Sequence, residues 1–413
     1  MSQTEVARTE SLDEQDPHWR EKDGDRKPKS RRPANTAFRQ QRLKAWQPIL
    51  TPKTVLPLFF IVGIIFAPIG GLLIWASSQV QEIVIDYSDC KDKAPWAPET
   101  SPIADKVRSS FKSSKSTSIP MWQKRWENKT LKGTSQRKNT TICSLFFDIP
   151  DPIGPPVFLY YRLTNFYQNH RRYVQSLDLD QLKGKPLDNN TISGSSCDPL
   201  RIDPITQKAY YPCGLIANSL FNDSISYPNL INIGPYVMTN KGIAWDSDKE
   251  LIKTTKYKPW EVVPPPNWKE RYPNGYTNDD PIPDLHEDEE FMVWMRTAGL
   301  PTFSKLSLRN DTAAMEAGNY RLDIDDHFPV TEYGGTKSIL ISTRTVMGGK
   351  NPFMGIAYVV VGGICIVLGA LFTVAHLVKP RKLGDHTYLT WNSEQPSTAI
   401  ATGRDDRFGS NTL

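Results

Sequence analysis

The residues that could do chemistry in this chain include an acidic run that starts at a histidine, His286-Glu-Asp-Glu-Glu290. Imidazole and carboxylate groups are common ligands of divalent metals in proteins. A zinc site of the His-Glu-x-x-His type needs a second histidine one helical turn after the first, and position 290 is a glutamate. The run therefore predicts a solvent-exposed acidic turn and no metal site.

A second candidate is Gly349-Lys-Asn351, which has part of a phosphate-binding loop. The first glycine of that pattern is missing, and Asn351 stands where a hydroxyl residue would hold magnesium. The chain also contains no G-x-S-x-G nucleophile elbow, no C-x-x-C pair and no Asp-Lys-Thr-Gly-Thr phosphorylation sequence of a P-type pump. We therefore expect no catalytic residues, no cofactor and no enzymatic activity of its own.

Two long apolar stretches, over 55–77 and 352–378, lie toward the two ends of the chain. Each is long enough to cross the hydrocarbon core of a bilayer, roughly 30 Å, as a helix. The first begins too far from the N-terminus for a signal peptide, and no A-x-A-like cleavage site follows it. The sequence predicts two transmembrane helices, of which the first is a retained signal anchor.

Charge sets the expected orientation of these helices. The segment 27–54, which leads into the first stretch, carries basic residues and no acidic one. Lys379, Arg381 and Lys382 follow the second stretch at once. By the positive-inside rule both termini are cytoplasmic, and the region between the helices is outside the cytosol.

Between the two stretches lie all the Asn-x-Ser/Thr acceptors of the chain and four of its five cysteines. The acceptors are Asn128, Asn139, Asn189, Asn222 and Asn310, and the cysteines are Cys90, Cys143, Cys197 and Cys213. Glycans and disulfides both belong to extracytosolic, oxidising compartments. Four cysteines allow three pairings, of which sequence proximity favours Cys197 with Cys213 and, by elimination, Cys90 with Cys143. Cys365 in the second stretch is expected to be a small packing residue.

The region 78–351 alternates short β-prone runs with Pro, Gly and Asn, which predicts a β-rich, antiparallel α+β ectodomain. Strands are expected over 82–87, 157–163, 291–295 and 338–346, and short helices over 171–182 and 315–321. Outside the spans, residues 1–34 are predicted to be a disordered cytoplasmic tail and 379–413 a second tail. The segment 35–54 mixes apolar and basic residues, which predicts a helix in the membrane interface or, alternatively, a charged stop before the membrane.

Glycines in both apolar stretches predict close helix packing, either of the two helices on each other or on a partner. They are Gly63, Gly70 and Gly71 in the first and Gly355, Gly362, Gly363 and Gly369 in the second. The net charge is +5, with the basic excess at the cytoplasmic flank of the membrane. This placement suits anionic phospholipid headgroups, and the sequence shows no nucleic-acid-binding module.

Several long blocks, in order along the chain, carry a resemblance to a known family. They are FRQQRLKAW at 38–46, YYRLTNFYQNHRRY at 160–173, PCGLIANSLFND at 212–223, VWMRTAGLP at 293–301, GGTK at 334–337, GGKN at 348–351 and KPRKLGD at 379–385. With these blocks the chain resembles the ligand-effect-modulator family, also called the cell-division-control protein fifty family. The likeness covers residues from about 33 to 391.

The resemblance implies a non-catalytic accessory β subunit of a type IV P-type ATPase, a phospholipid flippase, in a complex of about one to one. It implies a part in folding, export from the endoplasmic reticulum and activity of that complex, at the Golgi, an endosome or the plasma membrane. The family joins its first cysteine to its second and its third to its fourth, in agreement with the proximity argument. Two alternatives from other classes are a membrane-anchored receptor or adhesion glycoprotein and a membrane-anchored ectoenzyme, which would need a convergent acid/base pair in a pocket.

Overall fold

The computed structural model describes residues 35–43, 51–112, 118–343 and 349–380. The predicted tail 1–34, much of the predicted interfacial segment (44–50) and nearly all of the C-terminal tail (381–413) lie outside the described residues. Within 35–43 the backbone forms turns, in which the Gln40 N–H donates to the Thr36 carbonyl at 2.9 Å. Residues 57–378 form one compact unit, and the description below concerns this unit and the first turns of its leading helix.

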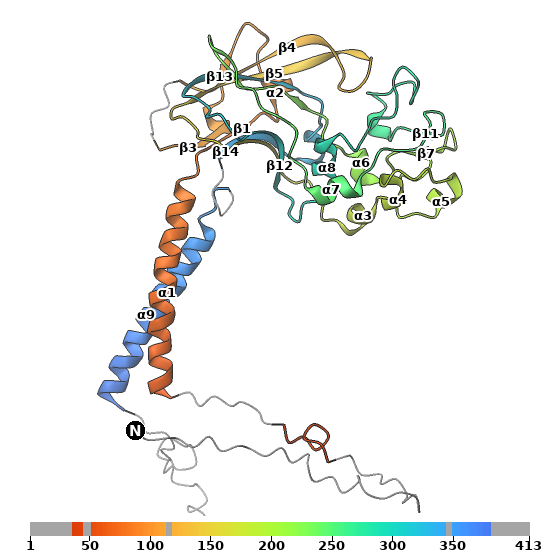
Figure 1. The fold of residues 1–413 in the computed structure, drawn as a ribbon. Helices are drawn as coiled ribbons and strands as arrows, with labels where there is room; N and C mark the ends of the chain where they lie inside the picture. Colours follow the sequence, from red (N-terminus) through yellow and green to blue (C-terminus); the bar gives the residue numbers. More distant parts are fainter. Residues whose placement is uncertain (1–34, 44–50, 113–117, 344–348, 381–413) are drawn as a thin grey trace, which may run out of the picture. The chain divides into compact units, whose positions relative to one another are not determined.

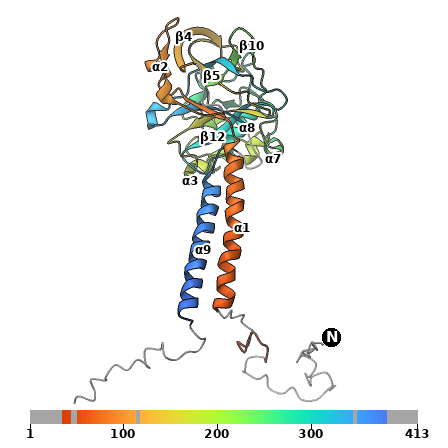
Figure 2. The same cartoon turned by 90° about the vertical axis from the view of Figure 1, so that its left-hand side faces the viewer.

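Two long helices, α1 (Pro52–Ser78) and α9 (Phe353–Val378), coincide with the predicted membrane spans to within three residues and lie side by side (Figure 1, Figure 2). By length and composition both can cross a membrane. Pro57 and Pro68 lie inside α1, which is helical through both of them. The prediction of two apolar helices that flank a β-rich antiparallel domain is confirmed.

Five antiparallel strands form the first sheet, in the order β12-β6-β14-β1-β3. Their bounds are β1 Glu82–Asp86, β3 Val107–Ser110, β6 Val157–Leu163, β12 Phe303–Asn310 and β14 Lys337–Thr343. The strand that follows α1 is β1, and the strand that leads toward α9 is β14. These two strands pair directly, from Glu82 opposite Ser342 to Asp86 opposite Ser338.

The second sheet follows the order β10-β9-β13-β5-β4-β2, with β8 also paired to β13. Its strands are β2 Ser101–Pro102, β4 Met121–Thr130, β5 Arg137–Ile149, β8 Ser224–Ile225, β9 Asn229–Leu230, β10 Gly234–Pro235 and β13 Gly318–Asp325. The two sheets pack face to face, because Ile85 and Ile341 of the first sheet share one core with Leu145 and Leu322 of the second. Each such buried side chain contributes about 1.5–3 kcal/mol.

A second lobe, within residues 177–295, has its own core. It contains the short parallel pair β7 (Ala209–Tyr210) and β11 (Val262–Val263) and several short helices. The helices outside the membrane spans are α2 Cys90–Lys93, α3 Arg171–Gln175, α4 Leu179–Leu182, α5 Asn189–Ser193, α6 Leu215–Asn218, α7 Asp246–Leu251 and α8 Glu289–Met295, with 3₁₀ turns at Ala104–Lys106, Pro266–Trp268 and Thr331–Tyr333. An aromatic cluster around Tyr161, Trp294 and Phe328 connects this lobe to the sheets.

Two sequence predictions are wrong about the element type. The run 291–295, predicted as a strand, lies in α8, where Asp288 caps the helix by accepting from the Phe291 N–H at 3.1 Å. Short apolar runs fit a buried helix as well as a strand, and here the capping residue decides. The run 315–321, predicted as a helix, leads into β13, in which every second residue from Tyr320 to Ile324 is buried against β5.

The other predicted elements lie close to their expected places. The strands predicted over 82–87 and 157–163 correspond to β1 and β6, and β14 begins one residue before the predicted start at 338. The helix predicted over 171–182 is divided into α3 and α4. The break lies at Ser176, whose buried hydroxyl accepts from the Leu215 N–H and donates to the Asp198 carbonyl.

Candidate functional site

The contact between α1 and α9 runs along glycines spaced seven residues apart. The glycines that face the other helix are Gly63 and Gly70 of α1 and Gly355, Gly362 and Gly369 of α9. Seven residues are about two helical turns, so glycines at this spacing share one face of a helix. A Cβ added at Gly70 would lie 2.7 Å from the Val359 backbone nitrogen, and one added at Gly362 would lie 2.9 Å from that of Ala67. These five glycines are thus used within the chain, for packing of one helix on the other.

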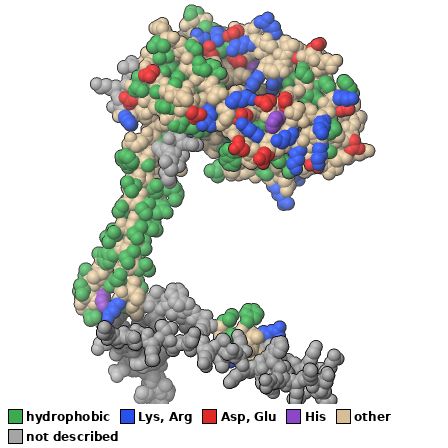
Figure 3. All heavy atoms as spheres, in the orientation of Figure 1, with side chains coloured by type: hydrophobic (Ala, Val, Ile, Leu, Met, Phe, Trp, Pro, Cys, Tyr) green, Lys and Arg blue, Asp and Glu red, His purple; other side chains and the backbone are tan. Residues whose placement is uncertain are grey.

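Gly71 and Gly363 lie outside this seam, and an added Cβ there would meet no atom within 4 Å. Large apolar side chains such as Leu72, Trp75 and Ile364 remain exposed on the outer faces. Figure 3 shows hydrophobic side chains along the visible face of the helix pair and mixed charges over the ectodomain. The outer faces of the pair therefore suit lipid chains or the apolar helices of another membrane protein.

The domain between the two helices holds them together at the ends that adjoin it. Where β1 begins and β14 ends, the Thr343 N–H donates to the Gln81 carbonyl at 3.1 Å. Just before α9, the Asn351 N–H donates to the Ser77 hydroxyl of α1, also at 3.1 Å. Residues 349–351, considered above as a phosphate loop, thus include a joint between the two helices.

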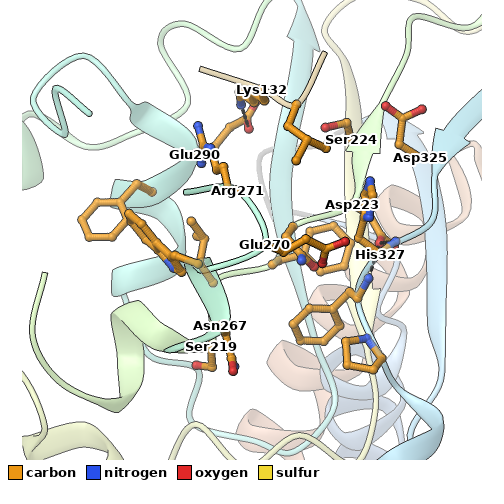
Figure 4. Close-up of a pocket in the computed structure, with 18 of the residues that line it drawn as sticks. Lys132, Ser219, Asp223, Ser224, Asn267, Glu270, Arg271, Glu290, Asp325 and His327 are labelled. Carbon is orange, nitrogen blue, oxygen red and sulfur yellow. Dashed lines mark hydrogen bonds and ion pairs between the residues drawn. The ribbon is translucent and has the colours of Figure 1, made fainter. Parts of the chain in front are cut away.

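A cavity of about 650 Å³ lies in the ectodomain between the strands and the second lobe. It is lined by residues from 129–132, 140, 218–224, 266–271, 288–291 and 325–333, with single contributions from β6, β12 and the loop after β6. Figure 4 shows Lys132, Arg271 and Glu290 on one side of the cavity and Asp223 and His327 on the other. Cavities of about 300–1,000 Å³ are the size that binds small ligands.

The cavity combines aromatic rings with paired charges. Tyr161 stacks on Phe221 at a centroid distance of 4.0 Å, and both rings line the space. Lys129 pairs with Asp325 at 2.9 Å, and Lys132 pairs with Glu290. Burial lowers the pKa of His327, and nearby carboxylates such as Asp223 oppose this shift.

Three buried polar atoms that belong to cavity-lining residues have no hydrogen-bond partner in the described part of the chain. They are Thr140 Oγ1, Arg271 Nε and the Tyr333 hydroxyl. Thr140 is only 2% exposed. An unpaired buried polar group costs about 1–3 kcal/mol, so three around one cavity call for a functional explanation.

A buried ionic cluster lies beside the cavity and joins distant parts of the ectodomain. Lys337 of β14, 1% exposed, donates to Asp223 at 2.8 Å and to Asp326 at 2.7 Å. Tyr87, just after β1, donates to the same Asp223 oxygen at 2.9 Å. Burial opposes the charge of Lys337, but the two carboxylates outweigh it and raise its pKa. Burial raises the pKa of Asp326, and Lys337 opposes this shift.

A buried ionisable side chain lies at each end of helix α8, and the charged form of each has the sign that the helix dipole favours. At its start, Glu289 accepts from the Ile243 N–H at 2.8 Å and pairs with Lys249 at 2.9 Å. Burial disfavours the Glu289 carboxylate, but backbone N–H donors and Lys249 outweigh burial and lower its pKa to about 2. At the other end, the Lys305 ammonium donates to the carbonyls of Val293 and Trp294 at 2.8 and 2.9 Å. Burial lowers the pKa of Lys305 to about 7.

The prediction of a solvated turn over 286–290 is therefore wrong at Glu289, which is 6% exposed. The loop that contains Ile243 and Ala244 folds over this carboxylate and supplies its hydrogen bonds. His286 lies with Nδ1 2.8 Å from the Ile252 carbonyl. In residues 35–43, 51–112, 118–343 and 349–380, no group of three His, Cys, Asp or Glu side chains could hold a metal ion.

The four ectodomain cysteines form two disulfides, Cys90–Cys143 and Cys197–Cys213, with Cα–Cα distances of 6.1 and 5.6 Å. The first joins α2 to β5 within the core between the sheets, and the second lies in the core of the second lobe. Cys365, in α9, is a partly exposed thiol.

The predicted glycan acceptors lie at four kinds of position. Asn128 and Asn139 are exposed and directly opposite each other on β4 and β5. Asn189 is exposed at the start of α5, and Asn310 is partly buried at the end of β12, where it donates to the Val237 carbonyl at 2.9 Å. Asn222 is exposed and lines the cavity.

Sequence reasoning missed the cavity and the ionic cluster. Their members come from segments more than a hundred residues apart, such as Tyr87, Asp223 and Lys337, and no local pattern connects them. One signal was present, because Asp223 and Lys337 are the last residues of two of the blocks that carry the family resemblance.

Comparison with known proteins agrees with that resemblance. The family described as "LEM3 (ligand-effect modulator 3) family / CDC50 family" matches residues 73–382. The "Phospholipid-transporting ATPase accessory subunit CRF1" of Saccharomyces cerevisiae is 44% identical over 371 residues, which are 89% of this chain and 91% of the relative. "Phospholipid-transporting ATPase accessory subunit CDC50" of Chaetomium thermophilum is 43% identical, over 89% of this chain and 92% of the relative. "Cell cycle control protein 50A" of Bos taurus is 39% identical, over 84% and 89%. The chain therefore belongs to the LEM3/CDC50 family.

Proposed function

We propose that this chain is the non-catalytic accessory subunit of a type IV P-type ATPase that translocates phospholipids. The observation that carries the proposal is the likeness to proteins named as such subunits over 89% of this chain and 91% of the relative. ATP hydrolysis and lipid movement belong to the ATPase, and this chain supports its folding, its export from the endoplasmic reticulum and its activity. The receptor and ectoenzyme alternatives gain no support from the names of the relatives.

The architecture fits this role. The seam glycines and the β1–β14 pair hold α1 and α9 together, so the chain presents a preassembled two-helix unit to its partner. Gly71, Gly363 and the exposed apolar side chains are available on its outer faces for the helices of the ATPase. Because the unit is already ordered, association with the partner costs less conformational entropy than docking of two separate helices.

The proposal includes a topology and a location. Both termini are cytoplasmic, and the ectodomain lies in the lumen or outside the cell, where Asn128, Asn139, Asn189, Asn222 and Asn310 are glycan acceptors. The complex travels from the endoplasmic reticulum to the Golgi, an endosome or the plasma membrane. The basic segment before α1 faces anionic headgroups of the cytoplasmic leaflet.

The test is to express the tagged full chain with each type IV ATPase of its source and to analyse what copurifies in detergent. We expect near equimolar copurification with at least one ATPase, and retention of that ATPase in the endoplasmic reticulum when the chain is removed. Normal export and lipid transport by every such ATPase without this chain would overturn the proposal. Turnover of a substrate by the purified chain alone would instead favour the ectoenzyme alternative.

A further inference from the structure

One of the predicted glycan acceptors, Asn222, lies at the ectodomain cavity. Of the five acceptors, Asn222 is the one among the cavity-lining residues, and its side chain is exposed at the surface of the ectodomain. The next residue, Asp223, is fixed in the buried cluster, where it also accepts from the backbone N–H groups of His327 and Phe328 at 2.6 Å. A glycan attached to Asn222 would start from an anchored point beside the cavity.

The lining suits a neutral ligand with many hydroxyls. A hydroxyl both donates and accepts, so it can bond to the Lys132–Glu290 and Lys129–Asp325 pairs without separating them. An ionic ligand would have to compete with these pairs. The stacked rings of Tyr161 and Phe221 add an apolar surface of the kind that receives the C–H face of a pyranose ring.

Three of the lining residues carry buried polar atoms without partners in the described part of the chain. Thr140 Oγ1 and the Tyr333 hydroxyl can donate or accept, and Arg271 Nε–H can donate. Arg271 also has no carboxylate within ion-pair distance in the described part of the chain, so its guanidinium is available to sugar oxygens.

The neighbouring acceptors are not placed to reach the cavity in this way. Asn128 and Asn139 precede the cavity-lining Lys129 and Thr140 on β4 and β5. Neither asparagine is among the residues that line the cavity. They therefore serve as internal controls.

We propose that the cavity is a carbohydrate-binding site and that its occupant is the N-linked glycan of Asn222 in the same chain. The inference depends on the lumenal placement of the ectodomain given under the proposed function. The bound sugar rings fill the space between the second lobe and the sheets and satisfy Thr140, Arg271 and Tyr333. The glycan thus becomes part of the ectodomain core.

The experiment uses the full chain in complex with its copurifying ATPase, made in a glycosylating host. The native complex is treated with peptide-N-glycosidase over time, and each site is quantified by glycopeptide mass spectrometry. We expect release at Asn222 to be about tenfold slower than at the exposed Asn189, because a bound glycan is reached only after local opening. Combining Thr140→Val with Tyr333→Phe, which keeps both shapes, should remove most of this difference. Tyr167→Phe changes an exposed tyrosine outside the cavity lining and should leave the difference in release rate unchanged.

A second measurement identifies the ligand chemistry with Asn222→Gln, whose melting temperature is compared with and without added chitobiose or inorganic phosphate. We expect chitobiose to raise the melting temperature of this variant and to leave the wild type unchanged. Release at Asn222 as fast as at Asn189, or an unoccupied Asn222, overturns the proposal. A response to phosphate alone would also overturn it and would indicate an anion site at Arg271. A glycan at Asn189 reports on the topology, and copurification of the ATPase reports on the proposed function. Both can be observed when the Asn222 glycan is not bound in the cavity, so failure of the inference is distinct from failure of the proposed function.

Discussion

Asn128 and Asn139 face each other across the β4–β5 hairpin, and the Asn128 side-chain amide donates to the Asn139 side-chain oxygen at 2.9 Å. Both residues are proposed acceptors, and a glycan would be attached through the amide nitrogen of each. Directly opposed Cβ atoms are ~4.5–5.5 Å apart. Two branched glycans that start from such closely spaced points on one face would crowd each other.

We therefore predict that the two sites compete. Mature protein should carry a glycan mainly on one of them, and Asn128→Gln should raise the occupancy of Asn139. The measurement is mass spectrometry of a single peptide that spans both sites, with Asn189 as the reference for general changes in glycosylation. A doubly glycosylated peptide as the main species would show that crowding has no effect.

The seam between α1 and α9 gives a prediction with a matched control one residue away. Gly70→Leu should lower the stability of the full chain in detergent by about 1–3 kcal/mol, because the new side chain meets the Val359 backbone. Gly71→Leu should leave the isolated chain unchanged, since nothing lies within 4 Å of its Cβ position. Thermal unfolding followed by tryptophan fluorescence measures both. Equal losses in the two variants would contradict the packing of the helix pair.

The buried cluster predicts a large effect of a single substitution. Lys337→Met removes the ammonium that pairs with both Asp223 and Asp326, which should cost about 3–5 kcal/mol and reduce export of the chain. Lys185→Met, at the exposed Lys185–Asp180 pair, is the control and should change stability little. Urea unfolding of the two variants in detergent provides the comparison. Similar urea midpoints for the two variants would mean that burial of Asp223 and Asp326 does not depend on the Lys337 ammonium.

Much of the fold could be predicted from the sequence because its signals are local. The apolar length of the spans, the turn residues around β1 and β6 and the acceptors between the spans are all readable over short windows. The helix α8 shows the limit of local reasoning. Its run Phe291–Met295 is apolar and short, and the Asp288 cap at its start distinguishes the helix from a strand.

The candidate site was less predictable, because its geometry depends on contacts between distant segments. The glycine pattern predicted close packing but not which glycines would face the other helix. That Gly70 faces α9 and Gly71 does not follows from the way α1 and α9 are aligned in the structure. The cavity brings Thr140, Asn222 and Tyr333 together from three loops and strands. Their residue types are ordinary for surface loops, so the unpartnered buried atoms of Thr140 and Tyr333 and the place of Asn222 beside the cavity are visible only in the folded chain.

Glu289 gives a prediction about pH. Its pKa is about 2 in the folded chain, against an ordinary value of 4.5, so between these values the unfolded chain binds a proton that the folded chain does not. The contribution of Glu289 to stability is therefore complete above about pH 4.5 and decreases as the pH falls toward 2.

Glu289→Gln keeps the shape but loses the charge that holds Ile243, Ala244 and Lys249, which should cost about 1.5–3 kcal/mol at neutral pH. Unfolding temperatures of wild type and variant, measured from neutral pH downward, should differ most above pH 5 and converge in acid. Glu250→Gln, at an exposed glutamate of α7, is the control and should match the wild type throughout. A gap between wild type and Glu289→Gln that stays constant into acid would show that the carboxylate charge is not what holds the 243–249 segment on α8.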